Sequence, residues 1–65
     1  MKTLKQIRAD HRVAEVRDVS GEDFSEGIKY EMNLADGFRF DDYSHLNYAR
    51  SVKELNELLD GVEVE

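Results

Sequence analysis

The chain has 65 residues, which is enough for one small domain that buries only about 60% of the surface of its unfolded chain. It contains no cysteine, which excludes disulfides and thiolate metal sites, so a homodimer is one way for it to bury further surface. The net charge of −6 argues against direct nucleic-acid binding, which needs a basic surface.

The first predicted element is a short helix over residues 3–9. Thr3 and Gln6 have the spacing of a capping box, in which each side chain pairs with the backbone amide of the other residue. Leu4 and Ile7, three residues apart, would lie on one side of this helix.

A strand is favoured over residues 12–19, because valine is enriched there. It would pair antiparallel with the strand predicted after it. The alternation is imperfect, because Ala14 and Val16 share one face while Val13 and Val19 lie on the other. Continuation of the first helix through this stretch therefore stays an alternative.

Turn-forming and acidic residues dominate the loop predicted at 19–27. Phe24, its one large apolar residue, could plug the edge of the core or contact a partner. Glu22, Asp23 and Glu26 lack the alternating oxygen ligands and the distal glutamate of an EF-hand calcium loop. We count these acidic residues and Phe24 as candidate interaction residues.

Residues 28–41 are predicted to form a tight hairpin, because apolar and polar residues alternate on both sides of a turn. A two-residue turn at Asp36 and Gly37 would place Arg39 on the apolar face. A three-residue loop over 35–37 keeps every apolar residue on one face. We therefore expect a type I turn followed by Gly37 with positive φ.

An amphipathic helix is predicted over residues 51–60. Ser51 and Glu54 form a second capping-box match, and Gly61 stands where a left-handed residue would end the helix. A helix this short is marginal alone, so its apolar stripe must dock on the apolar face of the hairpin. The stripe consists of Val52, Leu55, Leu58 and Leu59.

Two stretches beside this helix allow alternatives. The helix could extend backwards through Leu46, Tyr48 and Ala49 from a second cap at Ser44. Residues 62–65 alternate and could form an edge strand or fray.

Together these elements predict a single α+β domain over residues 1–65. It would have a short N-terminal helix, a three-stranded antiparallel β-meander and a C-terminal amphipathic helix packed on one face of the sheet. No apolar run approaches the roughly 20 residues of a membrane span, and the N-terminus lacks the apolar core of a secretory signal. We therefore expect a cytoplasmic protein with no membrane contact.

Charge is distributed unevenly along the chain. Residues 1–17 hold five basic and two acidic side chains, a net charge of +3, whereas residues 18–65 hold four basic and thirteen acidic ones, a net charge of −9. A solvated surface that keeps a small domain in solution explains this pattern. The alternative is that the acidic part faces a basic partner.

The only clustered candidates for metal ligands are Asp41, Asp42 and His45. Two carboxylates and an imidazole could hold a divalent ion, but paired aspartates after a strand are also common turn residues. The sequence has no phosphate-binding glycine loop and no nucleophile motif. We therefore predict no enzyme, no catalytic residue, no cofactor and no metal site, and keep this trio as the only metal candidates.

The three tyrosines of the chain are Tyr30, Tyr43 and Tyr48. Tyrosines beside a small sheet are often half-buried with a hydrated hydroxyl, whereas tyrosines in an exposed patch anchor interfaces. We favour half-burial, and we keep Tyr43 and Tyr48 as candidate interaction residues.

A resemblance to known proteins rests on Ile7 to Val13, Tyr30 to Phe38 and Ser51 to Leu59. The layout of these stretches resembles that of small hypothetical proteins of phages and prophage-bearing bacteria. Those proteins often have a proline where His11 stands, a tryptophan or tyrosine near Phe38 and a fuller histidine motif around His45. This chain departs from them at each point, and the resemblance implies an origin in a mobile element without a specific activity.

We expect a small non-enzymatic accessory protein that acts through contact with an unknown protein partner. An acidic phage-type inhibitor that mimics the phosphates of nucleic acid is the first alternative, and it requires acidic side chains along one continuous face. A divalent-metal-binding domain is the second alternative, and it requires Asp41 or Asp42 within ligand distance of His45.

Overall fold

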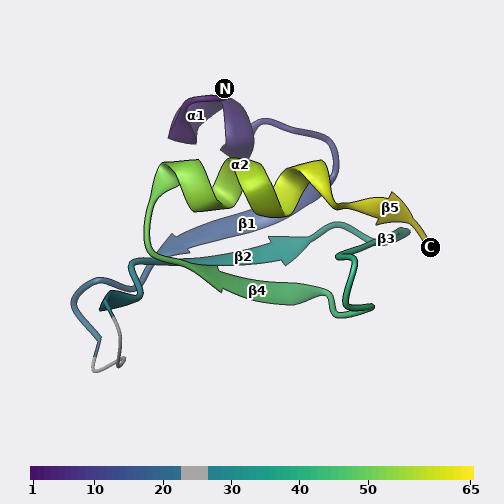
Figure 1. Ribbon diagram of the computed structural model, residues 1–65. Helices are drawn as coiled ribbons and strands as arrows, with labels where there is room; N and C mark the ends of the chain where they lie inside the picture. The colour runs from purple at the N-terminus through teal and green to yellow at the C-terminus, as the bar shows by residue number, and fades with distance from the viewer. Residues whose placement is uncertain (23–26) are drawn as a thin grey trace.

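The computed structural model of the chain describes residues 1–22 and 27–65, and Figure 1 shows two helices on one face of a β-sheet. This arrangement confirms the predicted α+β class, with a short N-terminal helix, a three-stranded antiparallel sheet and a C-terminal helix in contact with the sheet. In chain order the elements are α1 (Leu4–Arg8), β1 (Val13–Asp18), β2 (Tyr30–Leu34), β3 (Phe38–Arg39), β4 (Leu46–Ala49), α2 (Val52–Asp60) and β5 (Glu63–Val64).

The central strand of the three-stranded sheet is β2, which pairs antiparallel with β1 on one side and with β4 on the other. Val13 of β1 lies opposite Leu34, and a bulge then adds Ala14 as an extra residue. Because of this bulge, Val13 and Val16 are buried on the same face although they are three residues apart. The predicted strand is confirmed, and the bulge explains its imperfect alternation.

The predicted tight hairpin is wrong in its partner strand. β2 pairs with β4, whereas β3 pairs with β5 in a separate two-stranded sheet. The Phe38 amide donates to the Ala35 carbonyl at 3.3 Å, and Phe40 is buried in the core. Gly37 has the predicted positive φ, +91°, but it is the third residue of a turn over residues 35–38. A positive φ at the third position is the pattern of a type II turn, and not of the predicted type I turn followed by Gly37. The longer β4 bonds to more of the β2 edge than the two residues of β3 could.

Residues 46–49 form a strand, so the backward extension of the C-terminal helix is wrong. Ala49 is fully buried in the core beside the helices, and alternation turns Leu46 and Tyr48 toward the opposite face. Residues 62–65 follow the edge-strand alternative, because Glu63 and Val64 form β5.

The C-terminal helix α2 begins at the predicted cap. The Ser51 hydroxyl accepts the Glu54 amide at 3.2 Å, as predicted. The other half of the predicted capping box is wrong, because the Glu54 carboxylate accepts the amide of Arg50 instead of that of Ser51. Leu55 and Leu59 are buried against the sheet. The leucine stripe is therefore the lid of the core, as predicted.

The end of α2 differs from the prediction of a left-handed glycine. Gly61 has φ −92°, in the right-handed region. Its amide and that of Val62 donate to the carbonyls of Leu58 and Leu59, so the chain continues in a right-handed turn toward β5. The prediction is wrong because this turn satisfies the last carbonyls of the helix without a left-handed residue.

The N-terminal helix α1 begins with the predicted capping box. Thr3 Oγ1 accepts the Gln6 amide at 3.2 Å, and Gln6 Oε1 accepts the Thr3 amide at 2.8 Å. Ile7 is buried under the helix. Arg8 donates from Nη2 to the Val16 carbonyl at 3.0 Å, which covers one acceptor of the edge strand β1.

The core lies between the helices and one face of the sheet. In the described ranges no helix or strand covers the other face of the sheet (Figure 1). None of the helices in those ranges has the length and apolar character needed to cross a bilayer. The core residues are Ile7, Val13, Val16, Met32, Leu34, Phe40, Ala49, Leu55 and Leu59.

Candidate functional site

Exposed apolar side chains gather in one short stretch of the chain, at β4 and the loop before it. Tyr43 is 72% exposed, Tyr48 is 42% exposed and Leu46 is 37% exposed. The other exposed large apolar residues of the described ranges, Met1 and Val64, lie near the two ends of the sequence. This stretch is therefore the main concentration of apolar surface in the described part of the molecule.

Leu46 and Tyr48 lie on the uncovered face of the sheet. The strand register places Leu46 beside Asn33 and Tyr48 beside Glu31 of β2. Glu31 pairs with Arg17 of β1, at 3.2 Å between the Arg17 Nε and the Glu31 Oε1. The uncovered face is therefore apolar along the β4 edge and charged toward β1.

Tyr43 is held in the left-handed region, with φ +66°, which favours glycine and strains a tyrosine. Its amide donates to the Phe40 carbonyl, and the Phe40 amide donates to the Ser44 carbonyl, so residues 41–43 form a tight loop. The guanidinium of Arg39 lies 4.1 Å from the centre of the tyrosine ring. The ring is thus held in place by a cation while it remains exposed.

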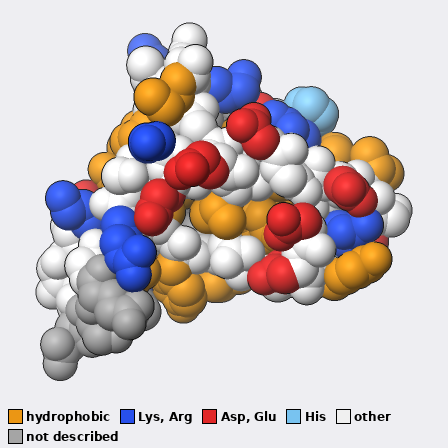
Figure 2. Space-filling model, in the orientation of Figure 1, with side chains coloured by type: hydrophobic (Ala, Val, Ile, Leu, Met, Phe, Trp, Pro, Cys, Tyr) orange, Lys and Arg blue, Asp and Glu red, His pale blue; other side chains and the backbone are white. Residues whose placement is uncertain are grey.

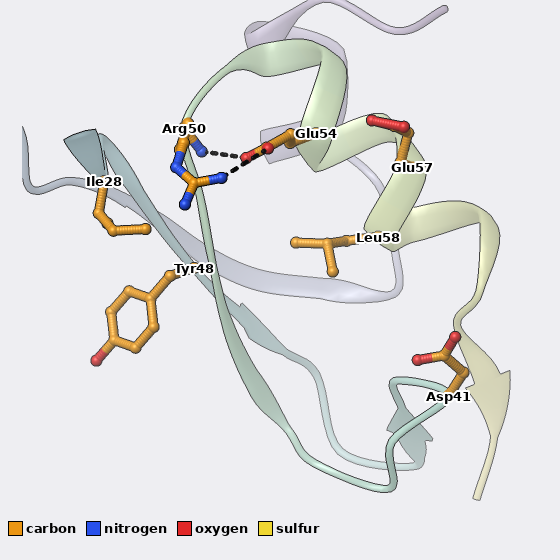
Figure 3. A pocket seen from close by; sticks show the side chains of 7 residues that line it. All are labelled: Ile28, Asp41, Tyr48, Arg50, Glu54, Glu57 and Leu58. Atoms are coloured by element: carbon orange, nitrogen blue, oxygen red, sulfur yellow. Dashed lines mark hydrogen bonds and ion pairs between the residues drawn. The ribbon is translucent and has the colours of Figure 1, made fainter. Parts of the chain in front are cut away.

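A groove of about 400 Å³ lies between α2 and the β4 edge, and we name it the α2–β4 groove. Figure 2 shows hydrophobic side chains exposed between acidic ones on the side of the molecule that carries α2. Figure 3 shows Leu58 pointing from α2 across the groove toward β4. The groove is lined by Ile28, Asp41, Tyr48, Arg50, Glu54, Glu57 and Leu58.

The lining of the α2–β4 groove is acidic. Three carboxylates and one guanidinium give it a formal net charge of −2. Arg50 pairs with Glu54, at 3.7 Å between Arg50 Nη1 and Glu54 Oε1. Asp41 and Glu57 are exposed, and neither forms an ion pair within the described ranges. Their charge is thus available to a partner.

The predicted metal candidates Asp41, Asp42 and His45 do not converge. His45 Nε2 lies 2.6 Å from the Glu65 carboxylate, and Asp41 faces the α2–β4 groove. Asp42 accepts the hydroxyl and the amide of Ser44, and these hydrogen bonds lower the pKa of Asp42. Across residues 1–22 and 27–65, no three His, Cys, Asp or Glu side chains are grouped so that they could hold a metal ion.

The acidic residues predicted to mimic phosphates do not form one face where the structure describes them. Glu22 follows β1 and lies 3.7 Å from Arg17, at the end of the sheet where β2 begins. Asp41 and Asp42 precede β4, at the opposite end of the sheet. The remaining predicted interaction residues, Asp23, Phe24 and Glu26, lie outside the described residues.

Hydrogen bonds keep several carboxyl groups charged. Arg12 holds the pKa of Asp10 well below its usual range. Arg17 lowers the pKa of Glu31, and a neighbouring serine lowers that of Asp18. A lowered pKa favours the charged form, which suits ion pairing and opposes proton donation near neutral pH. The absence of enzymatic activity stays a prediction.

The sequence predictions found part of this surface. The predicted half-burial of the tyrosines is correct for Tyr30, which packs against the core, and wrong for Tyr43 and Tyr48, which are exposed. Tyr43 lies in a tight loop and Tyr48 points to the uncovered face of the sheet, and their role as interaction residues stays a prediction. Leu46 and Leu58 are site residues that the sequence predictions missed. Leu58 could have been found from the width of the apolar stripe on α2. The stripe has four apolar residues, and only Leu55 and Leu59 are buried, so the others keep exposed surface.

The exposed stretch and the α2–β4 groove share Tyr48 and adjoin at the β4 edge. The resemblance of the sequence to small phage-type proteins stays a prediction. Comparison of this chain with protein-family models, with curated proteins and with solved structures finds no match, so the geometry of this surface alone points to a function.

Proposed function

We propose that the chain is a small non-enzymatic accessory protein that binds another protein through β4 and the loop before it. The observation that carries this proposal is the concentration of exposed Tyr43, Leu46 and Tyr48 in a single stretch. A contact that covers these side chains removes apolar surface from water. Tyrosine is also enriched among the residues that dominate interface energies.

The backbone at Tyr43 supports the same function. A tyrosine in the left-handed region costs roughly 1–2 kcal/mol relative to a residue in a favoured region, and glycine would avoid this cost. Strained positions persist where the surrounding structure enforces them, and they cluster at functional sites. An exposed, strained aromatic residue is better explained by a partner than by folding.

The two alternative functions have less support. Phosphate mimicry needs a continuous acidic face, but Glu22 and the pair Asp41 and Asp42 lie at opposite ends of the sheet. Metal binding needs converging ligands, which the described residues do not supply. Protein binding is therefore the function that the geometry supports best.

Site-specific photo-crosslinking in the native cell tests this proposal. A benzophenone amino acid replaces Tyr48 in one variant and Leu46 in a second. A matched control carries it at Lys5, which is exposed on α1 at the other side of the molecule. We expect a discrete covalent adduct from the two β4 positions and none from the control position.

The mass of the adduct identifies the protein that is bound, including a second copy of this chain. Absence of adducts from both β4 positions, with the variants folded by circular dichroism, would contradict the proposal. Equal adduct yields from all three positions would do the same, because they would indicate random collisions.

A further inference from the structure

The α2–β4 groove combines an apolar floor with acidic side chains on two sides. Leu58 points into the groove from α2, and Ile28 and Tyr48 lie across from it (Figure 3). All three side chains keep exposed surface. Figure 3 shows Glu57 on one side of Leu58 and Asp41 on the other. An apolar side chain that enters the groove would therefore lie between two carboxylates.

The negative charge of the α2–β4 groove favours a cationic partner over an anionic one. Arg50 is engaged by Glu54, while Asp41 and Glu57 have no ion pair within residues 1–22 and 27–65. The chain as a whole carries a net charge of −6, so its overall field adds to the negative potential of the groove. An anionic partner would be repelled, and a cationic one would be steered toward the groove.

The volume of the groove limits the size of the group that fills it. About 400 Å³ lies near the lower end of the range of about 300–1,000 Å³ that is usual for ligand pockets. A space of this size holds one or two side chains of a peptide. The remaining contacts of a larger partner would spread over the neighbouring stretch of Leu46 and Tyr48.

We propose that the α2–β4 groove binds a basic segment of a partner protein. One apolar side chain of this segment packs on Leu58, and lysine or arginine side chains lie beside Asp41 and Glu57. The inference deepens the proposed protein-binding function and rests on it. The apolar side chain supplies most of the affinity, since exposed charge pairs are individually weak and act mainly on selectivity and association rate.

A peptide titration of the ¹⁵N-labelled chain, followed by nuclear magnetic resonance, tests this inference. The probe is a synthetic peptide with blocked ends and one leucine between two pairs of lysines. One control peptide has serine in place of the leucine, and a second has glutamates in place of the lysines. We expect shifted amide signals around the groove with the probe, and binding at least about tenfold weaker with each control peptide.

Charge reversal on the protein provides the matched test. Glu57→Lys should weaken binding of the probe about tenfold, because a like charge then faces the lysines. Glu15→Lys changes the net charge equally at an exposed position on β1, outside the groove, and should change affinity by less than about twofold. Circular dichroism checks that both variants remain folded.

The inference is overturned if the probe gives no shifts, if the glutamate peptide binds equally well, or if both charge reversals weaken binding equally. If any of these results occurs while the Tyr48 position still gives crosslinks, the chain binds a protein, but that protein does not present a basic segment to the groove. Specific binding of the probe without crosslinks would instead contradict the broader proposal while leaving the chemistry of the groove intact.

Discussion

At the scale of single residues, Gly37 and Gly61 differ in whether their backbone conformation requires glycine. Gly37 has φ +91°, whereas Gly61 has φ −92° and room for a Cβ, which would lie 3.4 Å from the nearest atom of Asp41. We expect Gly37→Ala to lower the free energy of unfolding by about 1 kcal/mol and Gly61→Ala to keep or raise it. Urea unfolding followed by circular dichroism compares the two variants. Equal losses of stability in both would contradict this explanation.

Asp10 carries the ion pair that fixes the turn between α1 and β1. Its carboxylate accepts the Arg12 amide at 2.9 Å and the Arg12 guanidinium at 2.9 and 3.0 Å. We expect Asp10→Asn to lower the free energy of unfolding by about 1–3 kcal/mol near neutral pH, because charged hydrogen bonds become neutral ones. Urea unfolding measures the loss, and Asp36→Asn, at an exposed turn residue, is the control.

The pH dependence of this loss follows from the lowered pKa of Asp10. A lowered pKa in the folded state means that Asp10 stabilises the fold above its unfolded pKa of about 3.9. This contribution is lost as the pH falls below that value toward the pKa of the folded state. The difference in stability between the native chain and Asp10→Asn should therefore stay constant from about pH 7 to about pH 5 and shrink as the pH falls below about 4. A difference that also stays constant below about pH 4 would mean that the ion pair contributes nothing.

At the scale of elements, α2 stabilises the fold through two of its leucines. Leu55 is completely buried, whereas Leu58 is only half-buried at the α2–β4 groove. Leu55→Ala should lower the free energy of unfolding by about 2–5 kcal/mol, and Leu58→Ala should lower it by clearly less. The midpoints of urea unfolding compare the two. A larger loss from Leu58→Ala would show that the helix rests on the sheet differently.

Elements whose ends depend on neighbouring residues could be predicted from the sequence. The hydroxyl caps at Thr3 and Ser51 determine where the two helices begin, and both positions are confirmed. The choice between strands as partners for β2 depends on residues distant in sequence, and the local alternation of Phe38 and Phe40 pointed to the wrong one. The sequence of β4 does not show the alternation that predicts a strand, because its apolar residue Leu46 is exposed and not buried.

The candidate site could be predicted only in part for the same reason. Tyr43 and Tyr48 were candidates because exposed tyrosines anchor interfaces, but the sequence favoured half-burial for them, and both are exposed. The α2–β4 groove unites Asp41, Glu57 and Ile28, which come from three separate parts of the chain. Only the pairing of β4 with β2 and the docking of α2 bring them together, so no linear motif marks the groove.

At the scale of the whole molecule, stability should fall from the central strand outward. β2 is hydrogen-bonded on both sides and its Met32 is fully buried, whereas β3 and β5 are two residues long and Val64 is exposed. We expect the amides of β2 to exchange with solvent deuterium only on global unfolding, and those of β3 and β5 to exchange by local opening. Hydrogen exchange followed by nuclear magnetic resonance measures this. Protection in β3 and β5 equal to that in β2 would contradict it.

The bulge at Ala14 has a consequence for how chains of this kind can vary in length. Without Ala14, only Glu15 would separate Val13 from Val16, and the two valines would still point to the same side. A homologous chain that is one residue shorter here can therefore keep an identical interior. Insertions and deletions in descendants of this sequence are expected inside β1 as well as in surface loops, and an alignment that forbids gaps in strands would mismatch the valines.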